Sequence, residues 1–153
     1  MALQRPSQKE RDKVEKALNI SLAKPQREAI ASSLDNKIVI ITGGPGTGKT
    51  TIIRGVLDLW RKKKGKILLC APTGRATKRL AESTGRKAKT IHRLLEYRQD
   101  TGAFNRNANN PLPADLLVVD ESSMIDIQLM ASLLEALPDY CHLLMVGDVD
   151  QLP

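Results

Sequence analysis

The segment from Lys37 to Thr50 reads KIVIITGGPGTGKT, and its character changes halfway along. Residues 37–42 are mostly β-branched and apolar, which is typical of a short strand buried on both faces of a parallel sheet. Residues 43–50 include four glycines, and the apolar residues between Lys49 and Lys63 then recur at helical spacing. The segment therefore predicts a strand, a glycine-rich turn and a helix in direct succession.

The turn fits the pattern G-x-x-x-x-G-K-[ST] between a strand and a helix. Glycines allow successive backbone N–H groups to surround a β-phosphate, and the helix that follows adds the positive end of its dipole. In such loops the lysine reaches the β- and γ-phosphates and the hydroxyl ligates Mg²⁺. We therefore expect a nucleoside triphosphate site; the alternative is a glycine-rich turn with a surface lysine. The expected residues are Gly43, Gly44, Pro45, Gly46, Thr47, Gly48, Lys49, Thr50 and Thr51, with Lys49 catalytic and Thr50 on the metal.

The alternation of strand and helix repeats along the chain, which predicts an α/β fold with a mainly parallel sheet covered by helices on both faces. A polar stretch, 99–113, is expected to be a loop or an inserted hairpin. His142 and both cysteines lie in strand patterns and are interpreted as core. The further expected strands are 66–71, 116–120 and 141–146, and the expected helices are 7–18, 26–34, 49–63, 75–83, 90–97 and 127–137.

The net charge of +7 is distributed unevenly. Residues 61–93 hold twelve basic side chains and one acid, whereas residues 107–153 hold eight acids and no Lys or Arg. A basic half suits a polyanion, and an acidic half suits a divalent cation or simple solubility. The alternative for the run 61–66 is a solvated helix end followed by a loop.

Length and composition exclude several classes. The 153 residues fit one domain, and none of the apolar runs approaches the roughly 20 residues of a membrane span. The N-terminal residues lack the apolar run of a signal peptide. Two cysteines cannot form a disulfide scaffold or a complete zinc site. We expect a reduced, cytoplasmic protein with no membrane contact.

Two acids and an amide follow later predicted strands. Asp120 directly follows the apolar run 116–119, so its carboxylate leaves the sheet at the edge of the glycine-rich turn and can hold Mg²⁺. Glu121 can accept a proton from the attacking water. Gln151 follows the strand 141–146, and its amide can contact the γ-phosphate or the water. The alternative is that Asp120 and Glu121 merely open a turn.

Five segments together resemble the first motor domain of RecD-like DNA helicases of superfamily 1, a RecA-like P-loop NTPase domain. The resemblance extends from about Leu22 to the last residue and implies a helical lead-in over 1–24 and the motor domain over 25–153. The segments, in chain order, are GGPGTGKT (43–50), APTGRATKRL (71–80), TIHRLL (90–95), VDESSMID (119–126) and GDVDQLP (147–153).

The resemblance implies further roles. Gln26 would recognise the adenine edge, while Asp120, Glu121 and Gln151 would be the metal, base and sensor positions. The family moves 5′ to 3′ on single-stranded DNA and uses ATP with Mg²⁺. Aromatic rings that could stack on bases are scarce, and Tyr97 and Phe104 are the ones near the polar stretch. The implied DNA contacts are Thr73, Gly74, Arg75, Lys78, Thr90 and His92, with Arg79 nearby.

The family also has a second RecA-like motor domain, which supplies an arginine finger. We expect this chain to be a piece of such a protein, to hydrolyse ATP very slowly and to unwind nothing alone. Two alternatives remain open from the residues: a small-molecule P-loop kinase, and a nucleotide-switched module that only binds RNA or DNA.

Overall fold

The computed structural model describes residues 23–44 and 48–148, together with Ser7, Lys9, Asp12, Lys13 and Lys16. The expected helix 7–18 and the lead-in 1–24 therefore lie mostly outside the described residues. Pro45, Gly46, Thr47 and Gln151 lie outside them as well.

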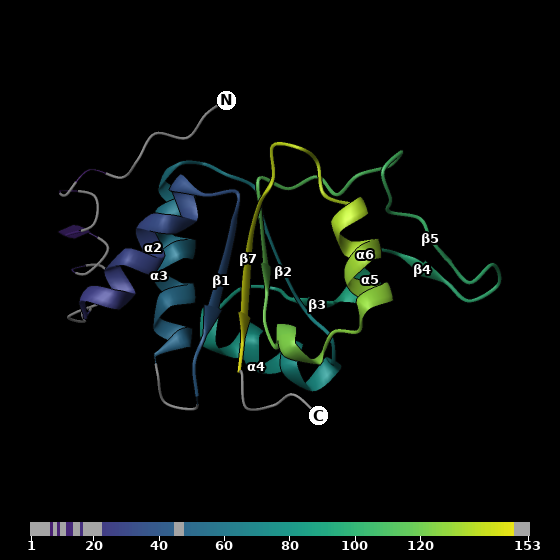
Figure 1. The fold of residues 1–153 in the computed structure, drawn as a ribbon, viewed down its shortest axis with the longest axis horizontal. Coiled ribbons are helices and arrows are strands. Elements are labelled where there is room, and N and C mark those ends of the chain that lie inside the picture. Colours follow the sequence, from purple (N-terminus) through teal and green to yellow (C-terminus); the bar gives the residue numbers. More distant parts are fainter. Residues whose placement is uncertain are drawn as a thin grey trace.

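The described ranges form a five-stranded sheet in which every pair of neighbouring strands is parallel (Figure 1). The strands β1 (Ile38–Thr42) and β7 (His142–Gly147) lie side by side with Ile41 opposite Val146. The strand β6 (Leu116–Val119) lies next to β7 with Val119 opposite Met145. The carboxyl ends of these three strands therefore meet at one edge, as predicted. The strand order is β1 (Ile38–Thr42), β7 (His142–Gly147), β6 (Leu116–Val119), β2 (Ile67–Ala71) and β3 (Lys89–Thr90).

Helices cover both faces of the sheet, which confirms the predicted fold class. Alternate residues of β6 enter different cores: Leu116 and Val118 join one, and Leu117 and Val119 join the other. The first core is completed by α2 (Lys24–Asp35), α3 (Lys49–Lys62) and α4 (Gly74–Thr84). The second is completed by α5 (Ile91–Leu94) and α6 (Ile127–Glu135).

The prediction that the strand before the glycine-rich turn is buried on both faces is wrong. Ile38 and Ile40 of β1 are 58% and 59% exposed, whereas Ile41 is buried against the α2–α3 side. The physical reason is position, because β1 pairs only with β7 among the described strands and no described helix covers its second face. The strand buried on both faces is β6, in which all four residues are buried.

The inserted hairpin, one of the two predicted forms of the stretch 99–113, is present but begins before that stretch, because its first strand is Tyr97–Arg98. The expected helix 90–97 ends at Leu94, because Glu96 adopts a left-handed φ of 56° and turns the chain. The antiparallel strands β4 (Tyr97–Arg98) and β5 (Ala103–Phe104) follow and project from the sheet (Figure 1).

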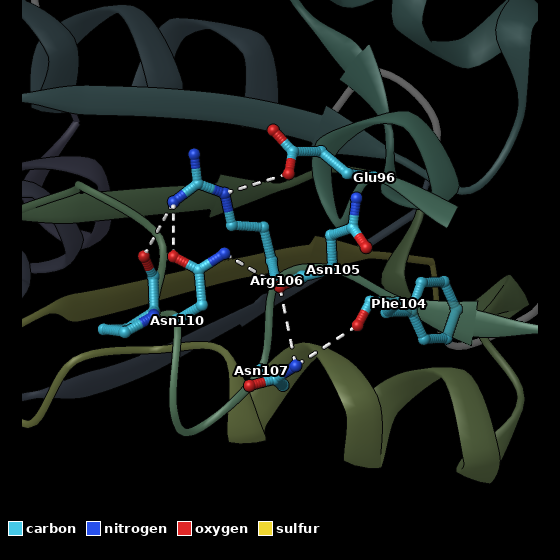
Figure 2. Close-up of polar contacts among 7 residues, drawn as sticks. Glu96, Phe104, Asn105, Arg106, Asn107 and Asn110 are labelled. Atoms are coloured by element: carbon cyan, nitrogen blue, oxygen red, sulfur yellow. Dashed lines mark hydrogen bonds and ion pairs between the residues drawn. The ribbon is translucent and has the colours of Figure 1, made fainter. Parts of the chain in front are cut away.

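Arg106 holds the chain after the hairpin in place (Figure 2). Its Nε lies 3.4 Å from Oε2 of Glu96, and its Nη1 donates to the carbonyl of Pro111 at 3.1 Å. Asn107 donates from Nδ2 to the carbonyl of Phe104 at 3.2 Å. These contacts connect both ends of the hairpin to the loop that leads into β6.

Candidate nucleotide-binding site

The glycine-rich turn connects β1 to α3 at the carboxyl edge of the sheet. Gly48 adopts a φ of 77° as the residue before the helix, a conformation that favours glycine. Lys49 is therefore the first residue of α3, and its Nζ donates to the carbonyl of Gly43 at 3.0 Å. The lysine side chain thus lies across the mouth of the turn and is 19% exposed.

Asp148 forms an ion pair with Lys49, a contact that sequence analysis missed. The carboxylate follows the last residue of β7, which is the strand next to β1. Its side chain is 15% exposed, so water screens the pair only partly. The available signal was its position: an acid directly after a strand that ends at the same edge as the turn.

Asp120 and Glu121 leave the sheet at the end of β6, as predicted. Burial raises the pKa of the Asp120 carboxyl, an effect that its hydrogen bond from the Glu121 N–H at 2.9 Å and the charges of Lys49 and Arg79 oppose. Glu121 has a left-handed φ of 54°, which is uncommon outside glycine and produces an abrupt turn. Both carboxylates line the same pocket as Lys49.

This pocket has a volume of about 280 Å³ and collects side chains from four separate segments. Lys49 and Thr50 come from the start of α3, Asp120 and Glu121 from the end of β6, and Asp148 from the end of β7. The helix α4 supplies the opposite wall with Arg79 and Ser83 among others. Cationic, hydroxyl and carboxylate groups therefore converge at one point of the sheet edge, which is the donor set that a metal–phosphate complex requires.

Arg79 is directed at the pocket. Its Nη2 lies 3.8 Å from Oε1 of Glu121, although the arginine side chain is 65% exposed. The family resemblance implies that Arg79 lies near the DNA contacts. The structure gives it a contact with the carboxylate expected to act as the base.

A second pocket, of about 330 Å³, lies next to the first and shares Lys49 with it. Gln26 lines it from α2 and accepts a hydrogen bond from the Ala23 N–H at 3.0 Å through Oε1. Its Nε2 occupies the position that a Cβ on Gly48 would need. The residue expected to recognise adenine therefore contacts the glycine-rich turn directly.

The loop after β6 is fixed to the end of β7. Ser122, the first residue of the 3₁₀ helix η1 (Ser122–Met124), donates from Oγ to the carbonyl of Val146 at 3.0 Å. A Cβ built on Gly147 would lie 2.8 Å from that Oγ and 3.1 Å from the backbone N of Ser123. Glycine at 147 thus permits the close approach that holds Asp120, Glu121 and Asp148 in one arrangement.

The expected DNA contacts lie at the same edge, beyond β2 and β3. These strands pair with Ala71 opposite Thr90, which places the starts of α4 and α5 near each other. Thr73 and Thr90 each accept a backbone hydrogen bond through Oγ1 at 3.2 Å, so both hydroxyls cap a helix. The side chains of Arg75 and Lys78 are exposed on α4, and a Cβ on Gly74 would meet nothing within 4 Å.

His92 is exposed and belongs to a group of three aromatic rings. Its ring centroid lies 5.5 Å from that of Tyr97 and 5.8 Å from that of Phe104. Tyr97 and Phe104, which belong to the two strands of the hairpin, are 5.2 Å apart. His142 contacts Trp60 instead, on the α2–α3 side of the sheet, and its Nδ1 faces the carbonyls of Ser33 and Asn36. Cys70 and Cys141 are buried, as expected.

No helix in the described part of the chain has the length and apolar character needed to cross a bilayer. Within the same ranges, no three His, Cys, Asp or Glu side chains gather as a ready metal cluster.

Comparison with known proteins identifies the family. The sequence model of the AAA domain family matches residues 26–153. The chain is 46% identical over 140 residues to the ATP-dependent RecD2 DNA helicase of Deinococcus radiodurans, a match that covers 92% of this chain and 19% of that protein. It is 41% identical over 151 residues to the RecBCD enzyme subunit RecD of Mycolicibacterium smegmatis, covering 83% of this chain and 27% of the relative.

Solved structures show the same fold. The Pif1 helicase from Candida albicans superposes with a TM-score of 0.69 at 26% identity, covering 88% of this chain and 34% of that one. A Bacteroides Pif1 bound to single-stranded DNA gives a TM-score of 0.61 at 23% identity over 88% of this chain and 33% of that one. The relatives favour a helicase motor over a small-molecule kinase. The chain spans about a fifth to a quarter of the curated relatives' length. It belongs to the AAA domain family and, within it, to the P-loop motor domains of RecD-like superfamily 1 helicases.

Proposed function

We propose that this helicase-family motor domain, within residues 25–153, binds and hydrolyses ATP to drive movement 5′ to 3′ along single-stranded DNA. The observation that carries the proposal is the convergence of Lys49, Asp120 and Glu121 on one pocket. The expected DNA contacts begin at the same sheet edge, at the starts of α4 and α5. A nucleotide and a strand would thus bind to neighbouring parts of one rigid sheet.

The nucleotide would occupy the turn 43–51, with its base at Gln26. Lys49 would exchange Asp148 and the Gly43 carbonyl for the β- and γ-phosphates, which are stronger charge-assisted partners. Thr50 and Asp120 offer the hard oxygen ligands that Mg²⁺ prefers, and few protein ligands suffice because phosphates and water complete its shell. Bound Mg²⁺ would neutralise phosphate charge and orient the γ-phosphate for in-line attack.

Glu121 would accept the proton of the attacking water, since its carboxylate lines the same pocket as Lys49. Arg79, 3.8 Å from that carboxylate, would keep it directed into the pocket. Gln151, which lies outside the described residues, would contact the γ-phosphate or the water and so distinguish triphosphate from diphosphate.

The strand would contact Thr73, Gly74, Arg75 and Lys78 at the start of α4, and Thr90 and His92 at the start of α5. Arg75 and Lys78 are exposed, so they are available to backbone phosphates, and backbone contacts provide grip without sequence preference. A solved structure of Bacteroides Pif1 bound to single-stranded DNA contains such a ligand, and that protein has the same fold.

Fast hydrolysis and unwinding would need a second RecA-like domain of the whole protein. The chain spans 19% of the RecD2 relative and 27% of the RecD relative, which leaves room for one. An arginine finger supplied in this way contributes about 10³–10⁵ in rate. We expect the 153-residue chain alone to bind ATP, to hydrolyse it very slowly and to unwind no duplex.

Nucleotide binding and hydrolysis can be separated with two variants. Lys49→Ala should abolish binding of a fluorescent ATP analogue, whereas Glu121→Gln should bind it normally. In a longer protein with both motor domains, each variant should lose ATPase activity that single-stranded DNA stimulates. Lys37→Ala, at an exposed lysine just before β1 and outside the nucleotide pocket, serves as the matched control.

Three outcomes would contradict the proposal. Normal nucleotide binding by Lys49→Ala would remove the phosphate site. Transfer of the γ-phosphate to a small-molecule acceptor would favour the kinase alternative. Equal stimulation by RNA and DNA would overturn the DNA assignment and favour a module that binds either nucleic acid.

A further inference from the structure

A pocket between α3 and α4 lies outside the nucleotide site and is lined by arginines. It has a volume of about 190 Å³, room for several water molecules of about 30 Å³ each. The helix α3 contributes Arg54, Leu57, Asp58 and Arg61, whose spacing places them on one face of the helix. Thr84 and Arg86, at the end of α4, form the other wall.

The local fold brings Arg86 to this position. Gly85 ends α4 with a left-handed φ of 67°, so the chain reverses after Thr84. The Thr84 hydroxyl donates to the carbonyl of Leu80 at 2.6 Å and accepts from the Arg86 N–H at 3.4 Å. The reversal is therefore tied to the helix, and the Arg86 side chain lines the pocket beside α3.

Asp58 neutralises only part of the positive charge around it. Its carboxylate is already paired, because Oδ1 lies 2.9 Å from Nη2 of Arg61 and Oδ2 lies 2.9 Å from Nζ of Lys62. Among the described residues, no carboxylate lies within ion-pair distance of Arg54 or Arg86. Arg54, Arg61, Lys62 and Arg86 thus share the single carboxylate of Asp58, and within the described part of the chain two of them, Arg54 and Arg86, have no anionic partner.

The positive surface continues past the pocket. Arg86 also lines a neighbouring cavity of about 390 Å³ together with Lys87 and with Lys89, the first residue of β3, whereas the rest of that lining is apolar and comes from β2 and Leu94. On the other side, Lys62 follows Arg61 at the end of α3. Several cations around one open pocket suit a polyanion, and arginine suits phosphate because its fork donates two parallel hydrogen bonds.

We propose that the α3–α4 arginine pocket is a second phosphate-binding site, in which Arg54 and Arg86 hold a phosphate group. The phosphate comes either from a nucleic-acid backbone or from a free phosphate ester, and the number of cations in and beside the pocket favours the backbone. The site is separate from the nucleotide pocket: Arg54 and Arg61 lie 5 and 12 residues beyond Lys49, about 7 and 18 Å along the helix. It requires neither ATP nor Mg²⁺.

The test is binding of a fluorescein-labelled oligothymidylate by the 153-residue chain, in EDTA and without nucleotide, over a series of salt concentrations. Arg54→Gln and Arg86→Gln should each weaken binding roughly two- to fivefold at low salt. Each should also lower the slope of log K against log salt by about 0.7, the value for one lost contact with a single strand. Lys37→Gln, which removes one exposed charge outside the pocket, should change neither quantity.

A double variant that conserves charge separates the effect of the arginine geometry from the effect of net charge. The double variant Arg54→Lys/Arg86→Lys should keep the salt slope and lose part of the affinity, because lysine keeps the charge but not the fork. If Lys37→Gln weakens binding as much as the pocket variants do, binding follows net charge alone and the proposal fails.

Titration with pyrophosphate distinguishes the sources of phosphate. The side-chain Nε–H resonances of Arg54 and Arg86 should shift and saturate. Shifts with pyrophosphate but unchanged oligonucleotide binding would assign the site to a free phosphate ester. No shift and no change in oligonucleotide binding would overturn the site altogether. Because no nucleotide is present, failure here leaves the proposed ATPase site untouched, and failure of Lys49→Ala leaves this site untouched.

Discussion

Lys49 and Asp148 form an ion pair across the mouth of the glycine-rich turn, although 99 positions separate them in the sequence. The pair exists because β1 and β7 are neighbours, with Thr42 opposite Gly147, so that the residues after both strands meet. The lysine proposed to bind phosphate is therefore held by a carboxylate, and an incoming phosphate must replace that carboxylate.

Replacing Asp148 should tighten binding of free nucleotide. Asp148→Asn keeps the size of the side chain but removes the charge that competes for Lys49 and repels the phosphates. A partly exposed pair contributes up to about 1 kcal/mol, so the dissociation constant of a fluorescent ATP analogue in EDTA should fall up to about fivefold. Asp139→Asn, at an exposed acid outside the pocket, is the matched control. Weaker binding by Asp148→Asn would show that this carboxylate supports the phosphates.

Adding a methyl group at Gly147 should destabilise the protein. In Gly147→Ala the new Cβ would meet the backbone of Ser123 as well as the Ser122 hydroxyl, and backbone yields less readily than a flexible side chain. Overpacking of this kind costs about 1–3 kcal/mol of unfolding free energy. Urea unfolding can be followed by the emission of Trp60, the single tryptophan, which is fully buried.

Gly74→Ala is the matched control for this variant, because its Cβ would meet nothing within 4 Å. We expect no loss of stability there, and a gain of up to about 1 kcal/mol from the less flexible unfolded chain. Equal stability of Gly147→Ala and the wild type would mean that the loop after β6 moves freely relative to β7.

Gly48→Ala should lose more stability than Gly85→Ala. Both positions have a left-handed φ, 77° and 67°, so both variants pay about 1–2 kcal/mol for an L side chain in that region. At Gly85 the Cβ has open space, but at Gly48 it also displaces the Gln26 amide. The second substitution Gln26→Ala should recover only the steric part. Urea midpoints of Gly48→Ala, Gly85→Ala, the double variant and Gln26→Ala alone test this order, and equal losses at both glycines would show that Gln26 moves aside without cost.

Asp120→Asn should stabilise the protein at neutral pH. Burial raises the pKa of the Asp120 carboxyl above its ordinary 3.8, so the folded protein binds this proton more tightly than the unfolded chain does. The contribution of Asp120 is therefore unfavourable above the raised pKa, shrinks as the pH falls through it and vanishes below the ordinary value. The advantage of the variant should follow the same course in urea unfolding at a series of pH values. An advantage that grows toward acid pH would reverse the assignment.

Local patterns predicted the elements that bear chemistry. The glycines before Lys49 predict a phosphate-binding turn, and the apolar run before Asp120 predicts a buried strand. Lys49 and Asp120 do line one pocket at the expected edge of the sheet. Strand order has no comparable signal. The run before Gly43 looks like a central strand, yet β1 is an edge strand of the described sheet and exposes Ile38 and Ile40.

The contacts that sequence reasoning missed depend on tertiary neighbours. Asp148 pairs with Lys49 only because of the strand order. The strand β3 was not predicted because it has two residues and no apolar run. The expected helix 90–97 was too long because the left-handed turn at Glu96 has no glycine to mark it. Arg86 joins Arg54 through a chain reversal after α4, which no local pattern connects to α3.

The helix α4 has a consequence for communication across the domain. Its first residues follow Thr73 at the expected strand contacts, Arg79 near its middle meets Glu121, and Thr84 at its end borders the arginine pocket. Eleven residues of α-helix form a rod about 16 Å long, and such rods shift as units by 1–2 Å when proteins change state. If the strand binds as proposed, tension at one end of α4 would move Arg79 relative to Glu121, the carboxylate proposed to activate water. The helix would then couple tension in the strand to the timing of the proposed hydrolysis.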